Sequence, residues 1–136
     1  QISTAGITEF TAQTAGDYLI ANNSAVRTIT NGTGANILWK ETKVGVAGTF
    51  RIKYTIASVG ANTTSNIYRN GVPANIVGTA RNTAGGTTTT YSEDINGWSS
   101  GDLVQIGCAG GNTNSTVYDL KICVANPVVT GDNLTY

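Results

Sequence analysis

The stretch YSEDINGWSSGDLVQI, residues 91–106, decides the fold of this chain. Its first half continues a Thr-rich segment and predicts a strand that ends near Ile95. Residues 96–101 have turn chemistry throughout and carry Trp98, and Asp102 then opens a second strand. Two strands joined by a Gly-punctuated turn favour an antiparallel β fold, and nothing in the stretch resembles a catalytic motif.

Residues 49–56 give the clearest strand pattern outside this stretch. One face carries Phe50, Ile52, Tyr54 and Ile56, and the other carries Thr49, Arg51, Lys53 and Thr55. Such an alternation is typical of an antiparallel strand with one face in the core and the other in water. A polar substitution at Ile52 is therefore expected to unfold the domain sooner than one at Lys53.

Short strand-like segments recur along the rest of the chain, separated by turn residues. They cover residues 17–21, 26–30, 37–44, 66–69, a segment around Ile76, a Thr-rich segment after Gly86, and residues 117–124. The dipeptide Asn70-Gly71 predicts a tight hairpin reversal, because it accepts positive φ at both central positions of a turn.

About nine short strands with no helical periodicity predict an all-β fold, a two-sheet antiparallel β-sandwich that is jelly-roll-like with extended terminal segments. A length of 136 residues fits one domain. We expect the sandwich to cover residues 17–126, with an N-terminal extension over residues 1–16 and a C-terminal tail over residues 127–136.

The composition excludes several classes of partner. Charged residues make up 12% of the chain, and eight basic residues balance eight acidic ones, so that the formal net charge is zero. Such a chain has no field that would gather nucleic acid or anionic lipid. No apolar run approaches the roughly 18 residues needed to span a bilayer.

The first residue is Gln1 and the chain contains no Met, so we expect a mature, secreted protein with an extracellular or cell-surface location. Sequons that could carry covalent glycans begin at Asn22, Asn31, Asn62, Asn114 and Asn133. Sequons also arise by chance in a sequence this rich in Thr and Asn, so unmodified asparagines are an equal alternative.

The succession GTFRIKYTI (residues 48–56), IYRNG (67–71) and SEDINGWSSGDLVQI (92–106) resembles the jelly roll of the complement-subcomponent and tumour-necrosis-factor-like families. It is even more similar to their relatives in phage tail fibres and prokaryotic surface proteins. The similarity covers roughly residues 37–125 and consists of strand spacing and turn residues. It implies an extracellular jelly roll within a multimeric structural or adhesive assembly. The chain lacks a collagen-like repeat, so the compact trimer of those families does not follow.

The chain has no His, which removes the commonest general base and most zinc-ligand sets. Glu93 and Asp94 are adjacent in a strand, point to opposite faces and cannot form an acid/base pair. Asp102 is expected to hydrogen-bond the backbone of its loop. A calcium site shared by Asp94 and Asp102 would supply too few of the oxygen ligands that calcium takes. We therefore expect no enzyme, no metal and no cofactor.

Cys108 and Cys123 are the only sulfur-containing residues. A disulfide between them would constrain the unfolded chain by about 3 kcal/mol. Strand parity places Cys108 with Val104 and Ile106, whereas it places Cys123 opposite Ile122, so one sulfur would point inward and the other outward. An intramolecular bridge, two free thiols and an intersubunit link remain alternatives.

The aromatic side chains could form a sugar-stacking platform. Trp39, Trp98 and the six Tyr residues would supply the rings, as in a carbohydrate-binding module. The simpler interpretation places most of them in the core or in interfaces, because the sequence shows no cluster of exposed aromatics with flanking amides.

The two ends of the chain give the functional hypothesis favoured by the sequence. The head carries Ile2, Ile7 and Phe10, and the tail carries Val128, Val129, Leu134 and Tyr136. Either segment could add a strand to the open sheet edge of a neighbouring copy. Such contacts do not close into a ring, and they therefore generate a filament. We expect a secreted structural subunit of an extracellular filament with copies of itself as partner, the N-terminal segment being favoured as the donor. The alternatives are a virion, tail-fibre or adhesin domain in a closed trimer, and a carbohydrate-binding module.

Overall fold

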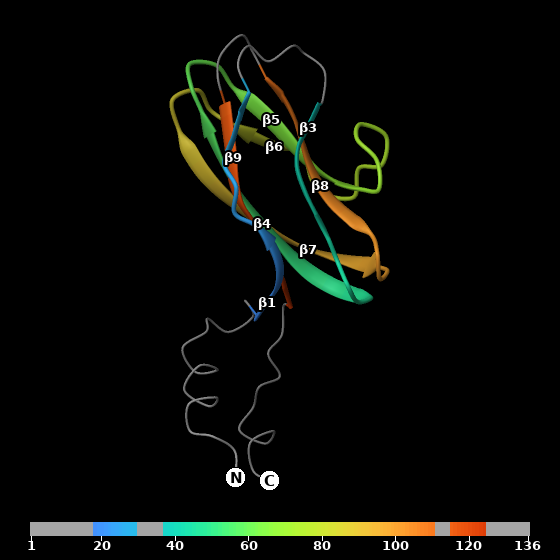
Figure 1. Cartoon of the computed structure of the whole chain (residues 1–136). Coiled ribbons are helices and arrows are strands. Elements are labelled where there is room, and N and C mark those ends of the chain that lie inside the picture. The colour runs from blue at the N-terminus through green and yellow to red at the C-terminus, as the bar shows by residue number, and fades with distance from the viewer. Residues whose placement is uncertain (1–17, 30–36, 111–114, 125–136) are drawn as a thin grey trace, which may run out of the picture.

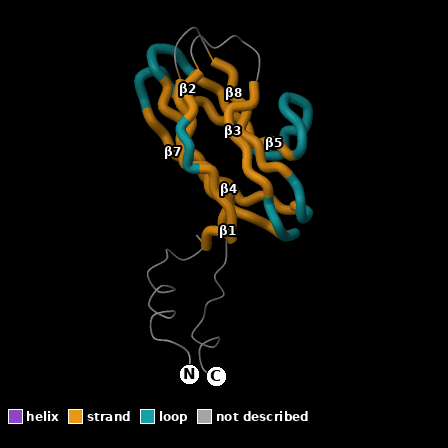
Figure 2. Tube along the Cα trace, in the orientation of Figure 1, coloured by secondary structure: helices purple, strands orange, loops and turns teal. Residues whose placement is uncertain are grey.

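The computed structural model describes residues 18–29, 37–110 and 115–124, which form two antiparallel sheets packed face to face (Figures 1 and 2). This part of the chain contains no helix. It accordingly offers no helical segment long and apolar enough to cross a membrane. The predicted all-β sandwich is confirmed, whereas the expected terminal segments 1–16 and 127–136 lie outside the described residues.

Nine strands are described. The first sheet has the order β1-β9-β4-β7, with β2 also paired to β9, and contains β1 (Tyr18–Asn23), β2 (Arg27–Ile29), β4 (Gly48–Ser58), β7 (Thr88–Trp98) and β9 (Ser115–Val124). The second sheet has the order β3-β8-β5-β6 and contains β3 (Ile37–Lys43), β5 (Thr63–Arg69), β6 (Arg81–Thr83) and β8 (Leu103–Gly110). From β2 onward the chain changes sheet at every connection except β5 to β6, as in a jelly roll.

The core lies between the sheets and is built on β4. All four apolar residues of its predicted inner face are buried, namely Phe50, Ile52, Tyr54 and Ile56. They pack with Ile67 of β5, Val104, Ile106 and Cys108 of β8, and Val117, Leu120 and Ile122 of β9. Burial of each such side chain contributes about 1.5–3 kcal/mol relative to exposure.

Strand β9 keeps its apolar side chains in the core by means of a bulge. The pairing register with β4 shifts between Lys121 and Tyr118, and Asp119 in the gap has φ of +53°. Val117 and Leu120 can therefore both face the core although they are three residues apart.

Buried hydroxyl groups in the interior form hydrogen bonds with one another. Thr63 Oγ1 lies 2.8 Å from Ser58 Oγ and 2.6 Å from Ser115 Oγ, which joins three strands. Tyr54 Oη lies 2.9 Å from Ser65 Oγ, and burial raises the pKa of this tyrosine well above its usual range. The interior of this sandwich therefore holds polar residues, and the hydroxyl groups at these positions each have a hydrogen-bond partner.

Strand β7 is longer than predicted. It continues past Ile95 to Trp98, with a register shift opposite Gly48 and Phe50, and Gly97 adopts φ of +80°. The turn chemistry at residues 96 and 97 thus serves a bulge inside the strand, and the reversal itself lies further along, at residues 99–102.

The prediction of a tight hairpin at Asn70-Gly71 is wrong. Asn70 has the expected positive φ of +53°. Its side chain, however, is hydrogen-bonded to β8, since Asn70 Oδ1 accepts a hydrogen bond from Leu103 N at 2.8 Å. Gly71 N donates to Gln105 Oε1 at 2.7 Å. Because these bonds hold the dipeptide against another strand, the chain makes a wide loop, and Ile76 forms only an isolated bridge before β6.

Replacing Ile52, which is fully buried, by Ala should lower the free energy of unfolding by about 2–5 kcal/mol, because a cavity opens in the core. The neighbouring change Lys53→Ala should alter it by less than about 0.5 kcal/mol. Urea denaturation followed by tryptophan fluorescence measures both values. Equal destabilisation by the two substitutions would contradict the assignment of the two faces of β4.

Candidate functional site

The adjacent carboxylates Glu93 and Asp94 face opposite sides of β7, as predicted. Glu93 points inward and accepts from Thr79 N at 2.9 Å and Thr79 Oγ1 at 2.8 Å. Asp94 points outward and accepts from Arg51 Nε at 2.7 Å and Nη2 at 3.0 Å. The Arg51 hydrogen bonds hold the pKa of Asp94 below its usual value. These two carboxylates therefore cannot act together on one substrate.

Asp102 accepts a hydrogen bond from the backbone of its own loop, which confirms the expectation from the sequence. Its Oδ2 accepts from Ser99 N at 2.8 Å and its Oδ1 accepts from Asn70 Nδ2 at 2.8 Å. The Ser99 backbone bond, followed by the Asn70 bond, lowers the pKa of Asp102. Asp94 is bonded to Arg51 instead, and no cluster of three metal-ligating side chains occurs among the described residues.

The two cysteines belong to different sheets and are not joined by a disulfide in the structure. Cys108 lies in β8 with its thiol in the core, where burial raises its pKa well above the usual value. Cys123 lies in β9, is paired with Arg51 of β4, and is buried outside the main core cluster. The structure thus separates the two sulfurs, as strand parity indicated: Cys108 belongs to the core cluster between the sheets, and Cys123 lies outside that cluster.

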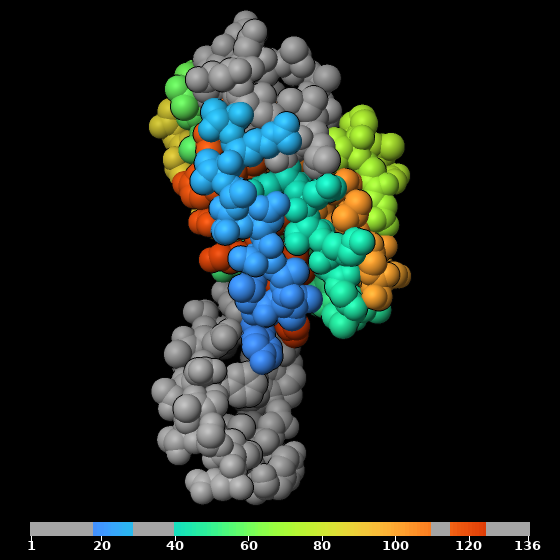
Figure 3. All heavy atoms as spheres, in the orientation of Figure 1, coloured from blue at the N-terminus to red at the C-terminus, as the bar shows by residue number. Residues whose placement is uncertain are grey.

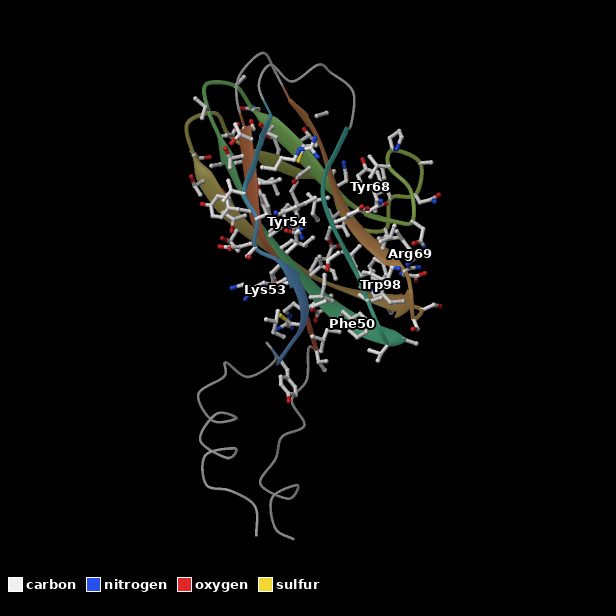
Figure 4. All side chains as sticks on the ribbon, in the orientation of Figure 1. Phe50, Lys53, Tyr54, Tyr68, Arg69 and Trp98 are labelled. Atoms are coloured by element: carbon white, nitrogen blue, oxygen red, sulfur yellow. The ribbon has the colours of Figure 1, made fainter. Side chains whose placement is uncertain are left out.

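The largest aromatic side chains cannot form a sugar platform. Trp98 is 2% exposed, and Tyr54 and Tyr68 are also buried. The guanidinium of Arg69 lies 4.3 Å from the centroid of the Trp98 ring, and the two side chains lie together near the end of β7 (Figure 4). Trp98 is a core residue, which confirms the simpler interpretation of the sequence, and the alternative interpretation of it as a ligand contact is wrong.

Many of the predicted interface residues lie outside the described part of the chain. This applies to Ile2, Ile7, Phe10, Val128, Val129, Leu134 and Tyr136, and to the sequons at Asn31, Asn114 and Asn133. The side chain of Trp39 is likewise outside the description. The sequon asparagines Asn22 and Asn62 are exposed, and their modification stays a prediction.

The outer face of the first sheet, which points away from the second sheet, gathers polar side chains from its strands. Cross-strand pairing defines its rows. One row runs from Tyr118 of β9 through Thr55 of β4 to Thr90 of β7. The next row contains Thr116 opposite Ala57, and Thr28 of β2 pairs with Thr116.

The hydroxyl groups of these rows are held in place by one another. Thr55 Oγ1 and Thr90 Oγ1 are 2.8 Å apart, and Thr28 Oγ1 and Thr116 Oγ1 are 3.0 Å apart. Tyr118 is half-buried in the middle of the sheet, so that part of its ring remains accessible. The result is a half-buried tyrosine with fixed hydroxyls on the neighbouring strands, of which that of Thr55 belongs to a buried residue and those of Thr28 and Thr90 belong to exposed residues.

The remaining rows of the same face carry charge. Lys121 of β9 lies opposite Lys53 of β4, which in turn lies opposite Ser92 of β7. Lys53 points away from the sandwich (Figure 4). Beyond it, Arg51 pairs with Asp94. Together with the Tyr118 row, these residues form what we call the Tyr118 face: Thr28, Arg51, Lys53, Thr55, Thr90, Ser92, Asp94, Thr116, Tyr118 and Lys121.

Sequence reasoning identified only the β4 part of this face. The alternation of residues 49–56 placed Lys53 and Thr55 on the solvent side. Tyr118 gave no comparable signal, because the bulge at Asp119 breaks the alternation of β9. The adjacency of β9 to β4 joins segments that are distant in the chain and that no local pattern connects.

The fold is similar to that of several solved sugar-binding structures. These include the carbohydrate-binding module CBM6cm-2 from Cellvibrio mixtus lichenase 5A in complex with cellotriose (16% identity, 79% of this chain and 99% of that one, TM-score 0.52). They also include the EclA C-terminal domain, a sugar-binding protein (14% identity, 90% and 97%, TM-score 0.54), and a CBM4 structure (14% identity, 81% and 79%, TM-score 0.52). No protein-family model and no curated protein sequence matches the chain.

These similarities support the jelly-roll architecture implied by the sequence resemblance. They do not support the relationship to the complement-subcomponent and tumour-necrosis-factor-like families or to phage tail fibres.

The change Trp98→Ala should lower the free energy of unfolding by about 3–5 kcal/mol, because it removes a buried ring and the stacking partner of Arg69. Tyr118→Ala should cost less than about 1 kcal/mol, since that ring is partly in water already. Chemical denaturation of the two variants tests this assignment. A Trp98→Ala protein as stable as the parent would place the ring on the surface after all.

Proposed function

We propose that this chain is a non-catalytic carbohydrate-binding module that works outside the cell and binds glycans on the Tyr118 face. The observation that carries the proposal is the half-buried ring of Tyr118, set among threonine hydroxyls on the neighbouring strands. The exposed sequon asparagines Asn22 and Asn62 support the extracellular location.

A glycan needs two kinds of contact, and this face offers both. The apolar C–H side of a pyranose ring packs on an aromatic ring, and its hydroxyls exchange hydrogen bonds with polar side chains. The side chains of the Tyr118 face stand on paired strands rather than on loops, so little conformational entropy is lost when the ligand binds. A binding surface built on the face of a sheet would suit an extended polysaccharide better than a small ligand enclosed in a pocket.

The structural similarities support the proposal at the level of the fold. A jelly roll of this kind binds cellotriose in one similar structure and serves a sugar-binding protein in another. Identities of 14–16% leave the sugar of the present chain to be argued from its own residues.

Tyr118→Ala should weaken binding to the glycans that the parent protein selects on a glycan array by about tenfold, because one stacking contact of about 1.4 kcal/mol is lost. Tyr118→Phe, which keeps the ring, should bind within about twofold of the parent. Isothermal titration with the selected glycan measures both.

Tyr18→Ala is the matched control, because Tyr18 is also partly exposed but lies in the edge strand β1. Its affinity should equal that of the parent. Parent-like affinity of Tyr118→Ala, or the absence of any bound glycan on the array, would overturn the proposal.

A second candidate function is self-association, and one observation favours it. Tyr18, Leu19 and Ile20 of the edge strand β1 are 44%, 44% and 38% exposed, and the β1 side chains lie on the surface of the molecule (Figure 3). Exposed apolar edge strands are sites for pairing with another chain. A donor strand from the head or tail of a neighbouring copy would fit this edge, and such a contact would build a filament.

Deleting residues 1–12 should convert filaments into monomers if the head is the donor. Negative-stain images and sizing chromatography of the parent and the deleted protein provide the readout. Unchanged filaments after the deletion would exclude the head as donor, and a monomeric parent protein would exclude self-association.

A further inference from the structure

We propose that the side chains of Lys40 and Asn23 become joined by a covalent amide bond, which the folded protein forms by itself. The bond links Lys40 Nζ in β3 to Asn23 Cγ in β1, and ammonia leaves. It ties an edge strand of the first sheet to an edge strand of the second sheet. Neither residue belongs to the Tyr118 face, so the cross-link is independent of the proposed glycan binding.

The two reacting side chains are in contact. Strands β1 and β3 lie side by side, although they belong to different sheets (Figure 3). Lys40 Nζ donates a hydrogen bond to Asn23 Oδ1 at 3.1 Å. The carbon that the amine must attack, Asn23 Cγ, is bonded directly to this oxygen. The fold thus removes much of the entropic cost of bringing the amine and the carboxamide together.

The carboxamide of Asn23 is held in a fixed orientation. Its Nδ2 donates to Glu41 O at 2.9 Å, and its Oδ1 also accepts from Ala25 N at 3.2 Å. Negative charge develops on Oδ1 when the amine attacks Cγ. The backbone N–H of Ala25 is already directed at that oxygen and stabilises this charge, as the donors of an oxyanion hole do.

The environment of Lys40 favours the reactive form of its amine. A protonated amine has no free electron pair, so only the neutral form can attack a carbonyl carbon. Lys40 is buried, with 5% of its surface exposed. Burial lowers the pKa of Lys40, and the charge of Asp119 opposes this effect in part. The neutral amine is therefore more accessible at Lys40 than at a lysine in water.

Asp119 is the carboxylate placed to move the proton. It stands in the bulge of β9, and its charge acts on Lys40. Glu41 follows Lys40 in β3 and so points to the opposite face, where its Oε2 accepts from Gln105 Nε2 at 2.9 Å. We therefore assign to Asp119 the transfer of a proton from the attacking amine to the departing nitrogen.

The reaction balances without a further reactant. The ammonium group of Lys40 gives one proton to the carboxylate, and the free electron pair of Nζ then forms a bond to Asn23 Cγ. When the carbonyl group forms again, the bond between Cγ and Nδ2 breaks, and Nδ2 departs with the protons that Nζ has lost. One ammonium group and one carboxamide become one secondary amide and one ammonium ion.

The cross-link would secure the side of the sandwich where the two sheets meet at β1 and β3. Among the described strands, β1 is paired with β9 alone, so a covalent bond to β3 would give it a second attachment. A bond between residues 23 and 40 constrains the unfolded chain in the way that a disulfide does. Unlike a disulfide, an amide is not broken by reducing agents.

Tryptic digestion of the denatured protein, followed by mass spectrometry, tests the bond directly. Trypsin cleaves after Arg and Lys but not after a lysine whose amine is acylated. The parent protein should yield residues 1–27 joined to residues 28–43, lighter than the sum of the two peptides by one ammonia molecule. Fragmentation should place the branch at Lys40 and Asn23. Cyclisation of Gln1 or a succinimide at Asn23 also releases ammonia, but neither prevents cleavage after Lys40.

Asn23→Ala and Lys40→Arg should each abolish the branched peptide, because each removes one of the two reacting groups. Asn22→Ala and Lys43→Gln are the matched controls, since these residues are exposed neighbours on the same two strands. Both control proteins should form the branch in the parent's amount. In the Lys43→Gln protein the second arm of the branched peptide ends at Arg51.

Asp119→Asn tests the proton transfer. Asn tolerates the positive φ of this position, so the bulge is kept while the carboxylate is lost. The branched fraction at a fixed time after synthesis should fall about tenfold or more. An undiminished fraction would overturn the role of Asp119. Complete cleavage after Lys40 in the folded parent protein would overturn the cross-link itself, and this result depends on no variant.

Discussion

Strand β4 must satisfy two environments at once, and the rest of the structure depends on how it does so. It pairs with β9 on one side and β7 on the other, so its backbone is enclosed and its side chains can only point inward or outward. The inward set, from Phe50 to Ile56, forms the centre of the core. Because successive side chains of a strand point to opposite faces, burial of this set places the intervening residues on the outer face.

The candidate site follows from that commitment. Lys53 and Thr55 stand on the outer face because Ile52 and Tyr54 are inside, and the neighbours of β4 then bring Lys121, Tyr118 and Thr90 beside them. The site therefore needs no loop to shape it, and its rigidity is that of the sheet. The same hydroxyl chemistry occurs inside the molecule, where Thr63 joins Ser58 and Ser115. On the inner side of β4, threonine and serine hydroxyls thus hydrogen-bond one another within the fold. On the outer side, threonine and serine hydroxyls belong to the candidate ligand site.

The sequence-based predictions were wrong where the conformation of a residue depends on contacts with segments that are distant in the chain. Gly97 was assigned to a turn, yet its positive φ serves a bulge that lets Trp98 enter the core. Asn70 was assigned to a tight hairpin, yet its side chain is bonded to Asp102 and Leu103 of a different segment. The burial of Trp98, by contrast, agrees with the favoured interpretation of the aromatics as core or interface residues.

The sequence by itself determined the all-β class, the two faces of β4, the opposite orientation of Glu93 and Asp94, and the lack of histidine. These are local properties, since propensity, turn residues and alternation act within a few residues of each other. Only the tertiary structure decided which strands are neighbours. It placed Tyr118 beside Thr55 and Lys121 beside Lys53, because pairing joins residues that are far apart in the chain and a bulge at Asp119 shifts the register between them. The candidate site is a property of that adjacency, so no single stretch of the sequence contains it.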